Sequence, residues 1–302
     1  MDRLVEICND GRHLAVFRGF MTVSHDGAEL GRVPLDAIDG VIVTAHGVTY
    51  SNNLLVALAQ KGAPLVVCGT NFAPVAVLMP LEGNFLQGAV LSAQAKAKET
   101  TLNRLWKDVV VAKIKQQAAV LDACGVTEKS LSLMAARVRS GDVENMEGQA
   151  AFFYFKALFG QTFRRDRDAG GINALLNYGY TVLRSAMIRA IVGSGLHPSL
   201  GMHHHNQYNA MRLADDLMEP YRPLTDFCVF RLAKENAASS VTAESKKRLA
   251  AVLSCTMNTA DGASEVNYLM MKTASSYAKC VTGETEKLFL PPPLSEMGLY
   301  GL

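Results

Sequence analysis

The sequence lacks several features that would define its class at once. It has no run of about 18 apolar residues, the length that a membrane-spanning helix needs. Its first residues show no apolar stretch after a basic start, so we predict a cytoplasmic protein. It also lacks the phosphate-loop pattern GxxxxGK[ST], in keeping with chemistry that needs no ATP.

No two cysteines stand in a CxxC spacing, which argues against a structural zinc site or a disulfide framework. The six cysteines are scattered singly: Cys8, Cys68, Cys124, Cys228, Cys255 and Cys280. We interpret them as small buried hydrophobic residues.

Strong net charge is also missing. The 30 lysines and arginines against 28 aspartates and glutamates give +2, too little to indicate nucleic-acid binding alone. Basic residues gather in three places: Lys113/Lys115, Arg137/Arg139 and Arg164/Arg165/Arg167. Each group has an ordinary explanation as a solvated helix face.

What the chain does contain is enough apolar sequence for a sizeable core, with 49% hydrophobic residues over a length of 302. The first 80 residues alternate short apolar runs with turn signals such as Asn9-Asp10-Gly11 and Asp26-Gly27, the pattern of successive antiparallel hairpins. One helix is expected at 51–61, capped by Ser51 and ended by Gly62. The expected strands are 4–7, 14–17, 21–23, 41–43, 64–67 and 75–79.

From about residue 81 the sequence acquires a helical apolar period rich in Ala, Leu, Lys, Glu and Gln. The tail Pro291-Pro292-Pro293 is expected to be extended. We therefore predict an α+β protein with a β-rich domain at 1–80 and a helical domain at 81–302. The expected helices are 89–122, 131–138, 142–159, 173–192, 207–217, 224–235, 243–252 and 265–277.

Glu147 is the first candidate for site chemistry. The apolar residues after it, Ala151, Tyr154, Phe155, Leu158 and Phe159, recur at steps of three and four, which places Glu147 over the same stripe of a helix. A lone carboxylate there is costly unless it is paired or binds a metal. The alternative is an ordinary glutamate at the positive end of the helix dipole.

The second candidate is a histidine cluster. His203, His204 and His205 are consecutive, and His197 precedes them in a Gly/Pro-rich segment. Adjacent residues of a loop point in different directions, so we expect a single ligand from the triplet. The alternative is a polar surface loop.

Asp216 and Glu219 form the third candidate. They stand three residues apart on one face of a helix that should end at Pro220, and such a pair repels itself unless a cation or a proton intervenes. The alternative is a solvated acidic helix end. Carboxylates together with a neutral imidazole suit manganese, magnesium or zinc.

With these segments in view, the sequence resembles the CRISPR-associated integrase family Cas1 over essentially its whole length. The motifs that carry the resemblance are Glu147-Gly148 with Ala150-Ala151 and Tyr154-Phe155, Asn177-Tyr178-Gly179-Tyr180, Gly195-Leu196-His197-Pro198 with Gly201 and His204, and Asp216-Leu217-Met218-Glu219-Pro220-Tyr221-Arg222-Pro223. The form Gly201 to Asn206 resembles the branch that accompanies type II systems, which use Cas9.

The resemblance implies that Glu147, His204 and Glu219 are catalytic ligands of Mg²⁺ or Mn²⁺, with Asp216 an auxiliary acidic residue. His203 and His205 are then neighbours and not ligands. Glu219 departs from relatives with aspartate at this position, which changes the reach of the ligand. The implied reaction inserts a short foreign DNA fragment into the CRISPR repeat by attack of its 3′-hydroxyl.

The resemblance also implies a homodimer joined largely through the β-rich domain, with two dimers flanking a Cas2 dimer. Arg164, Arg165 and Arg167 are candidates for phosphate contacts, and Arg222 either contacts phosphate or holds the Asp216 helix in place. Cas9 and further adaptation proteins are possible additional partners.

Two other functions remain open from the sequence. One is a metal-dependent, structure-selective DNA nuclease without integration, because the same ligands would serve hydrolysis. The other is a non-catalytic scaffold that holds DNA ends, against which the retained Glu147, His204 and Glu219 argue.

Overall fold

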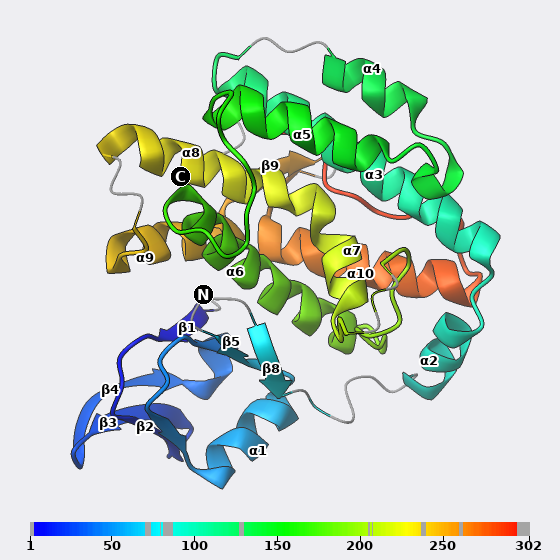
Figure 1. Ribbon diagram of the computed structural model, residues 1–302. Helices are drawn as coiled ribbons and strands as arrows, with labels where there is room; N and C mark the ends of the chain where they lie inside the picture. The colour runs from blue at the N-terminus through cyan, green and yellow to red at the C-terminus, as the bar shows by residue number, and fades with distance from the viewer. Residues whose placement is uncertain are drawn as a thin grey trace. The chain divides into compact units, whose positions relative to one another are not determined.

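A computed structural model describes residues 3–69, 74–78, 80, 87–126, 130–204, 206, 208–236, 240–259 and 262–294. The chain divides into two compact units, Met1–Phe85 and Leu86–Leu302 (Figure 1). The first unit is rich in strands and the second is mostly helical, so the predicted α+β class is confirmed.

Within its described residues, the first unit contains two four-stranded sheets, with strand orders β1-β5-β7-β8 and β4-β3-β2-β6. A short 3₁₀ turn at Leu35–Ala37 precedes β5, and α1 spans Asn52–Lys61. Apolar residues of both sheets and of α1 share one core, which includes Leu14, Met21, Val41 and Leu54. The strands are β1 Arg3–Ile7, β2 Arg12–Phe17, β3 Phe20–His25, β4 Ala28–Pro34, β5 Ile38–Val43, β6 Val48–Tyr50, β7 Leu65–Cys68 and β8 Pro74–Leu78.

The predicted run of hairpins is correct for β2, β3 and β4, which pair antiparallel in sequence. It is wrong for β1, which pairs in parallel with β5. The physical reason lies in the segment after β1: the Asp10 carboxylate accepts the amides of His46 (2.8 Å) and Gly47 (2.7 Å), which fastens this link to the β5–β6 connection. The chain therefore crosses between sheets here and does not fold back on β1.

Two described strands of the first unit, β4 and β6, were not predicted. Six of the seven residues of β4 are exposed and the strand shows no buried face, while β6 has only three residues. Helix α1 is confirmed with its boundaries: the Ser51 hydroxyl accepts the Leu54 amide, and Gly62 closes the helix with a φ of 74°.

The second unit is built of nine helices within its described residues, together with one short hairpin. Short 3₁₀ turns lie at Ser140–Asp142, Glu219–Tyr221 (η3) and Val252–Ser254. The helices are α2 Gln87–Ala95, α3 Glu99–Ala123, α4 Ser130–Arg137, α5 Met146–Phe159, α6 Ile172–Gly193, α7 Arg212–Met218, α8 Arg222–Asn236, α9 Ala243–Ala251 and α10 Val266–Thr282; the hairpin pairs β9 Thr256–Thr259 with β10 Gly262–Glu265.

The predicted helices are largely confirmed, although several boundaries differ and one hairpin was missed. The expected helix 89–122 is two helices, because the backbone is extended at Lys98. Helix α7 begins at Arg212 and not at 207. The hairpin β9–β10 was not predicted.

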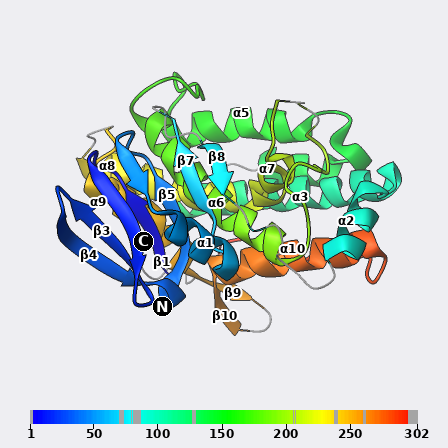
Figure 2. The ribbon, with the colours of Figure 1, turned by 90° about the horizontal axis from the view of Figure 1, so that it is seen from below.

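Helix α3 positions the rest of the second unit. At 25 residues it is about 37 Å long, and α5 runs along it in both views (Figures 1 and 2). It also contacts α7, η3 and α8, so side chains from four separate elements meet its buried face. Among the described residues, no helix has the length and apolar content needed to cross a bilayer.

Candidate functional site

The buried face of α3 carries a lysine among apolar residues. Trp106, Val109, Val110 and Ile114 are buried at helical spacing, and Lys113 lies on the same stripe with 7% of its surface exposed. Lys115, two residues on, is exposed. The solvated-face interpretation therefore fits Lys115 and is wrong for Lys113.

The start of α5 brings Glu147 to this lysine. Asp142 accepts the amides of Met146 (2.9 Å) and Glu147 (3.0 Å), and the Asn145 side chain accepts that of Gly148. These bonds satisfy the free amides at the helix start and fix the direction in which Glu147 leaves it. Helix α5 therefore begins at Met146, four residues after the predicted start.

The apolar face of α5 also differs from the prediction. Its buried residues are Met146, Ala150, Tyr154 and Leu158. Ala151, Phe155 and Phe159 were expected in the same buried stripe, but they are only partly buried. The buried stripe of α5 is therefore centred on Ala150, Tyr154 and Leu158, each one residue before Ala151, Phe155 and Phe159.

The Lys113 ammonium lies between two carboxylates. It forms ion pairs with Glu147 Oε1 and with Glu219 Oε2, the latter at 2.5 Å, and the Lys113 and Glu219 side chains are only 8% and 6% exposed. Burial opposes the charge on Lys113, but Glu219 and Glu147 outweigh it and raise its pKa. Lys113 in turn holds the pKa of Glu147 below its ordinary value.

Arg222 adds a second buried cation. Its guanidinium lies 3.1 Å from Glu219 and 4.0 Å from Asp215, and 4.9 Å above the centre of the Tyr180 ring. Asp215 is also held by both arms of Arg184. The sequence left two roles open for Arg222, a phosphate contact or holding the Asp216 helix in place. These contacts favour the second role, in which Arg222 holds the α7–η3 segment.

Asp216 is fully buried and contacts the segment 197–204, here called the histidine loop. Its carboxylate accepts the backbone amides of Met202 (2.6 Å) and His203 (3.0 Å), and it bonds Nδ1 of His204. The bond to Asp216 raises the pKa of His204. Asp216 thus orders the loop. The repulsion expected between Asp216 and Glu219 is relieved by separate partners: backbone amides and His204 at Asp216, and Lys113 and Arg222 at Glu219.

The loop needs glycine at position 201. A Cβ there would lie 2.7 Å from Cβ of Arg212, 3.0 Å from the His204 carbonyl oxygen and 3.2 Å from the Asp216 carboxylate. The backbone therefore approaches Asp216 more closely than a side chain at this position would allow.

Trp106 and Gln94 hold the loop from the other side. The Trp106 ring stacks on His203 with 4.4 Å between centroids and meets His204 edge-on at 5.7 Å. The Gln94 amide bonds the backbone of His197 in both directions and the Leu200 carbonyl. The backbone of His197 thus anchors the loop while its side chain is exposed, and His205 lies outside the described residues.

The three predicted ligands do not form a ready metal shell. In the described part of the chain no group of three His, Cys, Asp or Glu side chains is placed to hold a metal ion. The structure brings Glu147 and Glu219 together on Lys113, and it joins His204 to Asp216. Both glutamates and His204 are close enough for mutual electrostatic effects, since Glu219 raises the pKa of His204 and His204 lowers that of Glu147.

The donor chemistry nevertheless fits a divalent cation. Two carboxylates converge on one positive charge, so the potential at this position favours a cation. A histidine that bonds a carboxylate through Nδ1 presents its second ring nitrogen, the arrangement found in protein metal ligands. Glu147, Glu219 and His204 thus have donor atoms of the kind that could hold a divalent cation, although they are not arranged as a metal shell.

The arginines after α5 differ from one another. Arg165 bonds Asn173 (3.0 Å) and Asn177 (2.6 Å) and lies over the Tyr180 ring, so it fastens the loop to α6. Arg164 and Arg167 are exposed. Of the three, these two have side chains free to reach a ligand in solvent.

A buried carboxyl lies behind Arg222. Asp226 of α8 is 1% exposed and accepts the Tyr180 hydroxyl at 2.5 Å. Burial raises the pKa of Asp226 to about 7, although its hydrogen bonds oppose the shift. Tyr180 therefore connects this carboxyl with the guanidinium groups of Arg165 and Arg222.

Sequence reasoning missed Lys113, Trp106 and Asp226 as parts of this site. A signal existed for Lys113, because a lysine on the apolar stripe of a long helix needs a buried anion as partner. Asp226 gave a weaker signal, as a carboxyl set among the apolar residues of the first half of α8. Nothing in the sequence marked Trp106 as a neighbour of the histidines.

Comparison with known proteins now identifies the family. The family model described as "CRISPR associated protein Cas1" matches residues 5–260, a range that includes every candidate site residue. The chain belongs to the Cas1 family. The resemblance seen in the sequence is thereby confirmed.

Two curated Cas1 relatives illustrate the match. The CRISPR-associated endonuclease Cas1 of Neisseria meningitidis serogroup C is 38% identical over 231 residues, covering 76% of this chain and 75% of the relative. A CRISPR-associated endonuclease Cas1 of Pyrobaculum aerophilum is 28% identical over 266 residues, covering 82% of this chain and 90% of the relative.

Solved structures show the Cas1 fold. A casposase bound to an integration product superposes with a TM-score of 0.84 at 20% identity, covering 100% of this chain and 96% of the other. A Cas1 protein from Thermotoga maritima gives a TM-score of 0.78 at 17% identity, with 95% and 99% covered.

The first prediction concerns the buried cation of this Cas1 chain. Lys113→Met leaves Glu147 and Glu219 without their shared partner, which should cost about 3–5 kcal/mol of unfolding free energy. Urea denaturation without divalent ions measures it. The exposed Lys115→Met should change stability by less than about 0.5 kcal/mol, and an equally small effect at Lys113 would contradict the buried ion pairs.

The second prediction concerns Asp226 and pH. The folded protein holds the Asp226 proton up to about pH 7, whereas an unfolded chain releases it near the ordinary aspartate value of 3.8. Stability should therefore fall as pH rises through this window and level off above it. Asp226→Asn removes this contribution, so its stability relative to the wild type should rise by on the order of 3 kcal/mol between about pH 4.5 and about pH 7.5.

Urea denaturation at several pH values measures this change. The exposed Asp122→Asn should follow the wild-type profile. A parallel profile for Asp226→Asn would show that the buried carboxyl does not retain its proton.

Proposed function

We propose that this Cas1 chain is a divalent-metal-dependent DNA integrase that inserts short DNA fragments into a CRISPR array. The observation that carries the proposal is the convergence of Glu147 and Glu219 on one cation, beside His204 oriented by Asp216. The structural likeness to a casposase bound to an integration product supports joining chemistry on this fold.

The residues divide the work as follows. Glu147, Glu219 and His204 would hold the metal, which would supply positive charge to the reacting phosphodiester and to the attacking 3′-hydroxyl. Asp216 fixes the ring of His204 and the backbone of its loop, and Trp106 limits the movement of the imidazole. Arg222 holds Glu219 in position through their ion pair.

The partners follow from the family. We propose a homodimer formed through the β-rich unit and an assembly with Cas2, with double-stranded DNA as substrate. A solved Cas6-RT-Cas1--Cas2 complex contains the same fold, at a TM-score of 0.77 and 15% identity, covering 98% of this chain and 36% of that chain. Cas9 belongs to the proposal through the likeness to the type II branch.

The second candidate is hydrolysis without integration, which the name "endonuclease" of the curated relatives favours. The same residues would then act on water and not on a DNA hydroxyl. Purified protein is incubated with Cas2, a short duplex, a supercoiled plasmid carrying a repeat, and Mn²⁺. Joined products support integration, whereas cleavage alone supports the nuclease.

The third prediction tests the site in this assay. His204→Ala should abolish joining while duplex binding, measured by anisotropy, changes less than about twofold, because the imidazole holds the metal and not the DNA. His197→Ala serves as control, since its exposed side chain belongs to the same loop outside the site. Joining by His204→Ala at the wild-type rate would remove His204 from the ligand set.

The fourth prediction tests metal binding without activity. Lys113 occupies the position of positive charge between the glutamates, so Lys113→Met should bind Mn²⁺ without this competitor. Its melting temperature should rise with Mn²⁺ by clearly more than that of the wild type or of Lys115→Met. An equal rise in all three proteins would place the metal elsewhere.

A further inference from the structure

Asp226 is a buried acidic group that the proposed chemistry does not use. It lies on α8 with 1% of its surface exposed, where an ionised carboxylate is costly unless partners compensate it. The Tyr180 hydroxyl of α6 donates to this carboxyl at 2.5 Å, and Tyr154 of α5 faces it as well. The carboxyl therefore joins two helices of the unit directly behind the candidate site.

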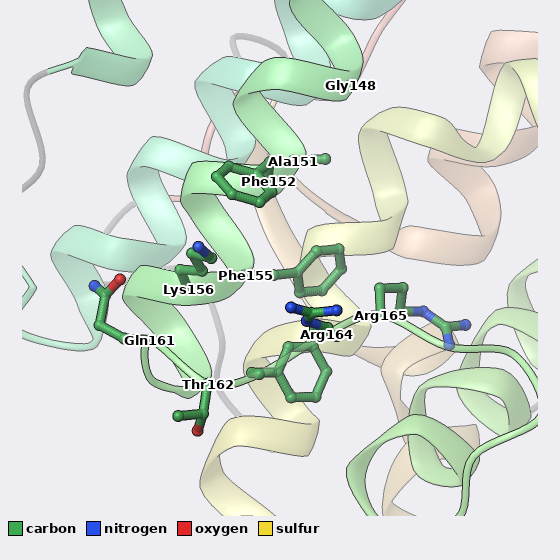
Figure 3. Close-up of a pocket in the computed structure, with 10 residues that line it drawn as sticks. Gly148, Ala151, Phe152, Phe155, Lys156, Gln161, Thr162, Arg164 and Arg165 are labelled. Carbon is green, nitrogen blue, oxygen red and sulfur yellow. The ribbon is translucent and has the colours of Figure 1, made fainter.

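Tyr180 carries the influence of Asp226 to two arginines. The Arg222 guanidinium lies 4.9 Å from the centre of the Tyr180 ring, and the Arg165 guanidinium lies 5.5 Å from it. Arg165 comes from the loop after α5, and Figure 3 shows its side chain pointing away from that helix. A phenol that donates a hydrogen bond to a carboxylate has a more electron-rich ring, which attracts cations more strongly.

Arg222 is held short of the best geometry with Glu219. A guanidinium can bind both oxygens of a carboxylate through two parallel hydrogen bonds, as Arg184 binds Asp215 with two bonds of 2.7 Å. The closest approach of Arg222 to Glu219 joins Nε and Oε1 at 3.1 Å. In the described part of the chain, Arg222 Nε and Glu219 Oε2 are both buried without an aligned hydrogen bond. Oε2 lies instead beside the Lys113 ammonium.

We propose that Asp226 is a positioning residue of the metal site, which acts through the Tyr180 ring to keep Arg222 from closing on both oxygens of Glu219. The proposal rests on the proposed function, because it requires a divalent ion at Glu219. An arginine that closed on both oxygens would occupy this ligand and compete with the ion. Asp226 and Tyr180 thus leave Oε2 to the cation that lies between the glutamates.

Ionisation of Asp226 strengthens this hold. The titratable groups that act on its carboxyl are Tyr154 of α5, Tyr180 of α6, Lys113 of α3 and Arg165 of the loop after α5. Burial outweighs them and raises the pKa of Asp226 to about 7. A divalent ion nearby adds positive charge and favours the ionised carboxylate, so by linkage the ionised form binds the ion more tightly.

The experiment measures the affinity of the full chain for Mn²⁺ in the absence of DNA, from the paramagnetic resonance signal of the free ion. Asp226→Asn keeps an acceptor for the Tyr180 hydroxyl and removes the charge. Its affinity should equal that of the wild type near about pH 6 and be about threefold to tenfold weaker near about pH 8. Titration of His204 is common to both proteins and cancels in their ratio.

Two buried tyrosines supply a matched pair of variants. Tyr180 and Tyr154 both face Asp226, and the two arginines lie over the Tyr180 ring. Tyr180→Leu should weaken Mn²⁺ binding about tenfold, whereas Tyr154→Leu should change it less than about twofold. Tyr180→Phe retains the ring and should recover most of the affinity that Tyr180→Leu loses. Circular dichroism verifies that each variant is folded.

Each outcome decides between the possibilities. Equal Mn²⁺ affinity of Asp226→Asn and the wild type at the higher pH, or equal effects of the two leucine variants, overturns the positioning role. If Tyr180→Leu does not fold, Asp226→Asn still gives the answer, because it has nearly the same shape as the wild type. Strand joining is measured separately. A wild type that shows the expected pH dependence but joins no DNA leaves the positioning role standing and overturns the proposed integrase, whereas joining by a protein whose Mn²⁺ affinity is independent of Asp226 does the reverse.

Discussion

The second unit depends on one buried ammonium group. Lys113 of α3 neutralises Glu147 at the start of α5 and Glu219 at the end of α7, so three elements that are distant in the sequence meet at a single charge. Two ionised carboxylates could not share this partly desolvated position without a cation. The electrostatic requirement that stabilises the unit thus also defines the place where chemistry can occur.

A second constraint fixes the histidine loop. Asp216 collects two short backbone bonds and the bond to the His204 ring, Gly201 permits the close approach, and Trp106 stacks against His203. The loop is held by packing and hydrogen bonds on several sides, so His204 is placed without a metal. Because the loop is already ordered, a ligand that binds there does not have to order it, and less of its binding free energy is lost.

The sequence predicted the fold class and most helices, because the apolar period is a local property of each segment. It did not predict the parallel pairing of β1 with β5, which depends on a bond from Asp10 to a turn more than 30 residues away. Sequence motifs singled out Glu147, His204 and Glu219 as site residues. The contacts that link them through Lys113 and Asp216 form only in the tertiary structure, so the motifs did not predict them. The lysine on an apolar stripe was visible in the sequence and would have indicated a buried acidic partner.

Two cations act on Glu219, and their chemistry differs. Arg222 is fixed by Glu219, Asp215 and the face of Tyr180, and its planar group cannot leave one partner without disturbing the others. Lys113 ends a flexible four-carbon chain as a point charge, which can withdraw from the carboxylates without moving the backbone. In the proposed integrase, Arg222 therefore keeps Glu219 in place in every state, and Lys113 supplies the positive charge that a divalent ion replaces. The site then never carries two unneutralised glutamates, with metal or without it.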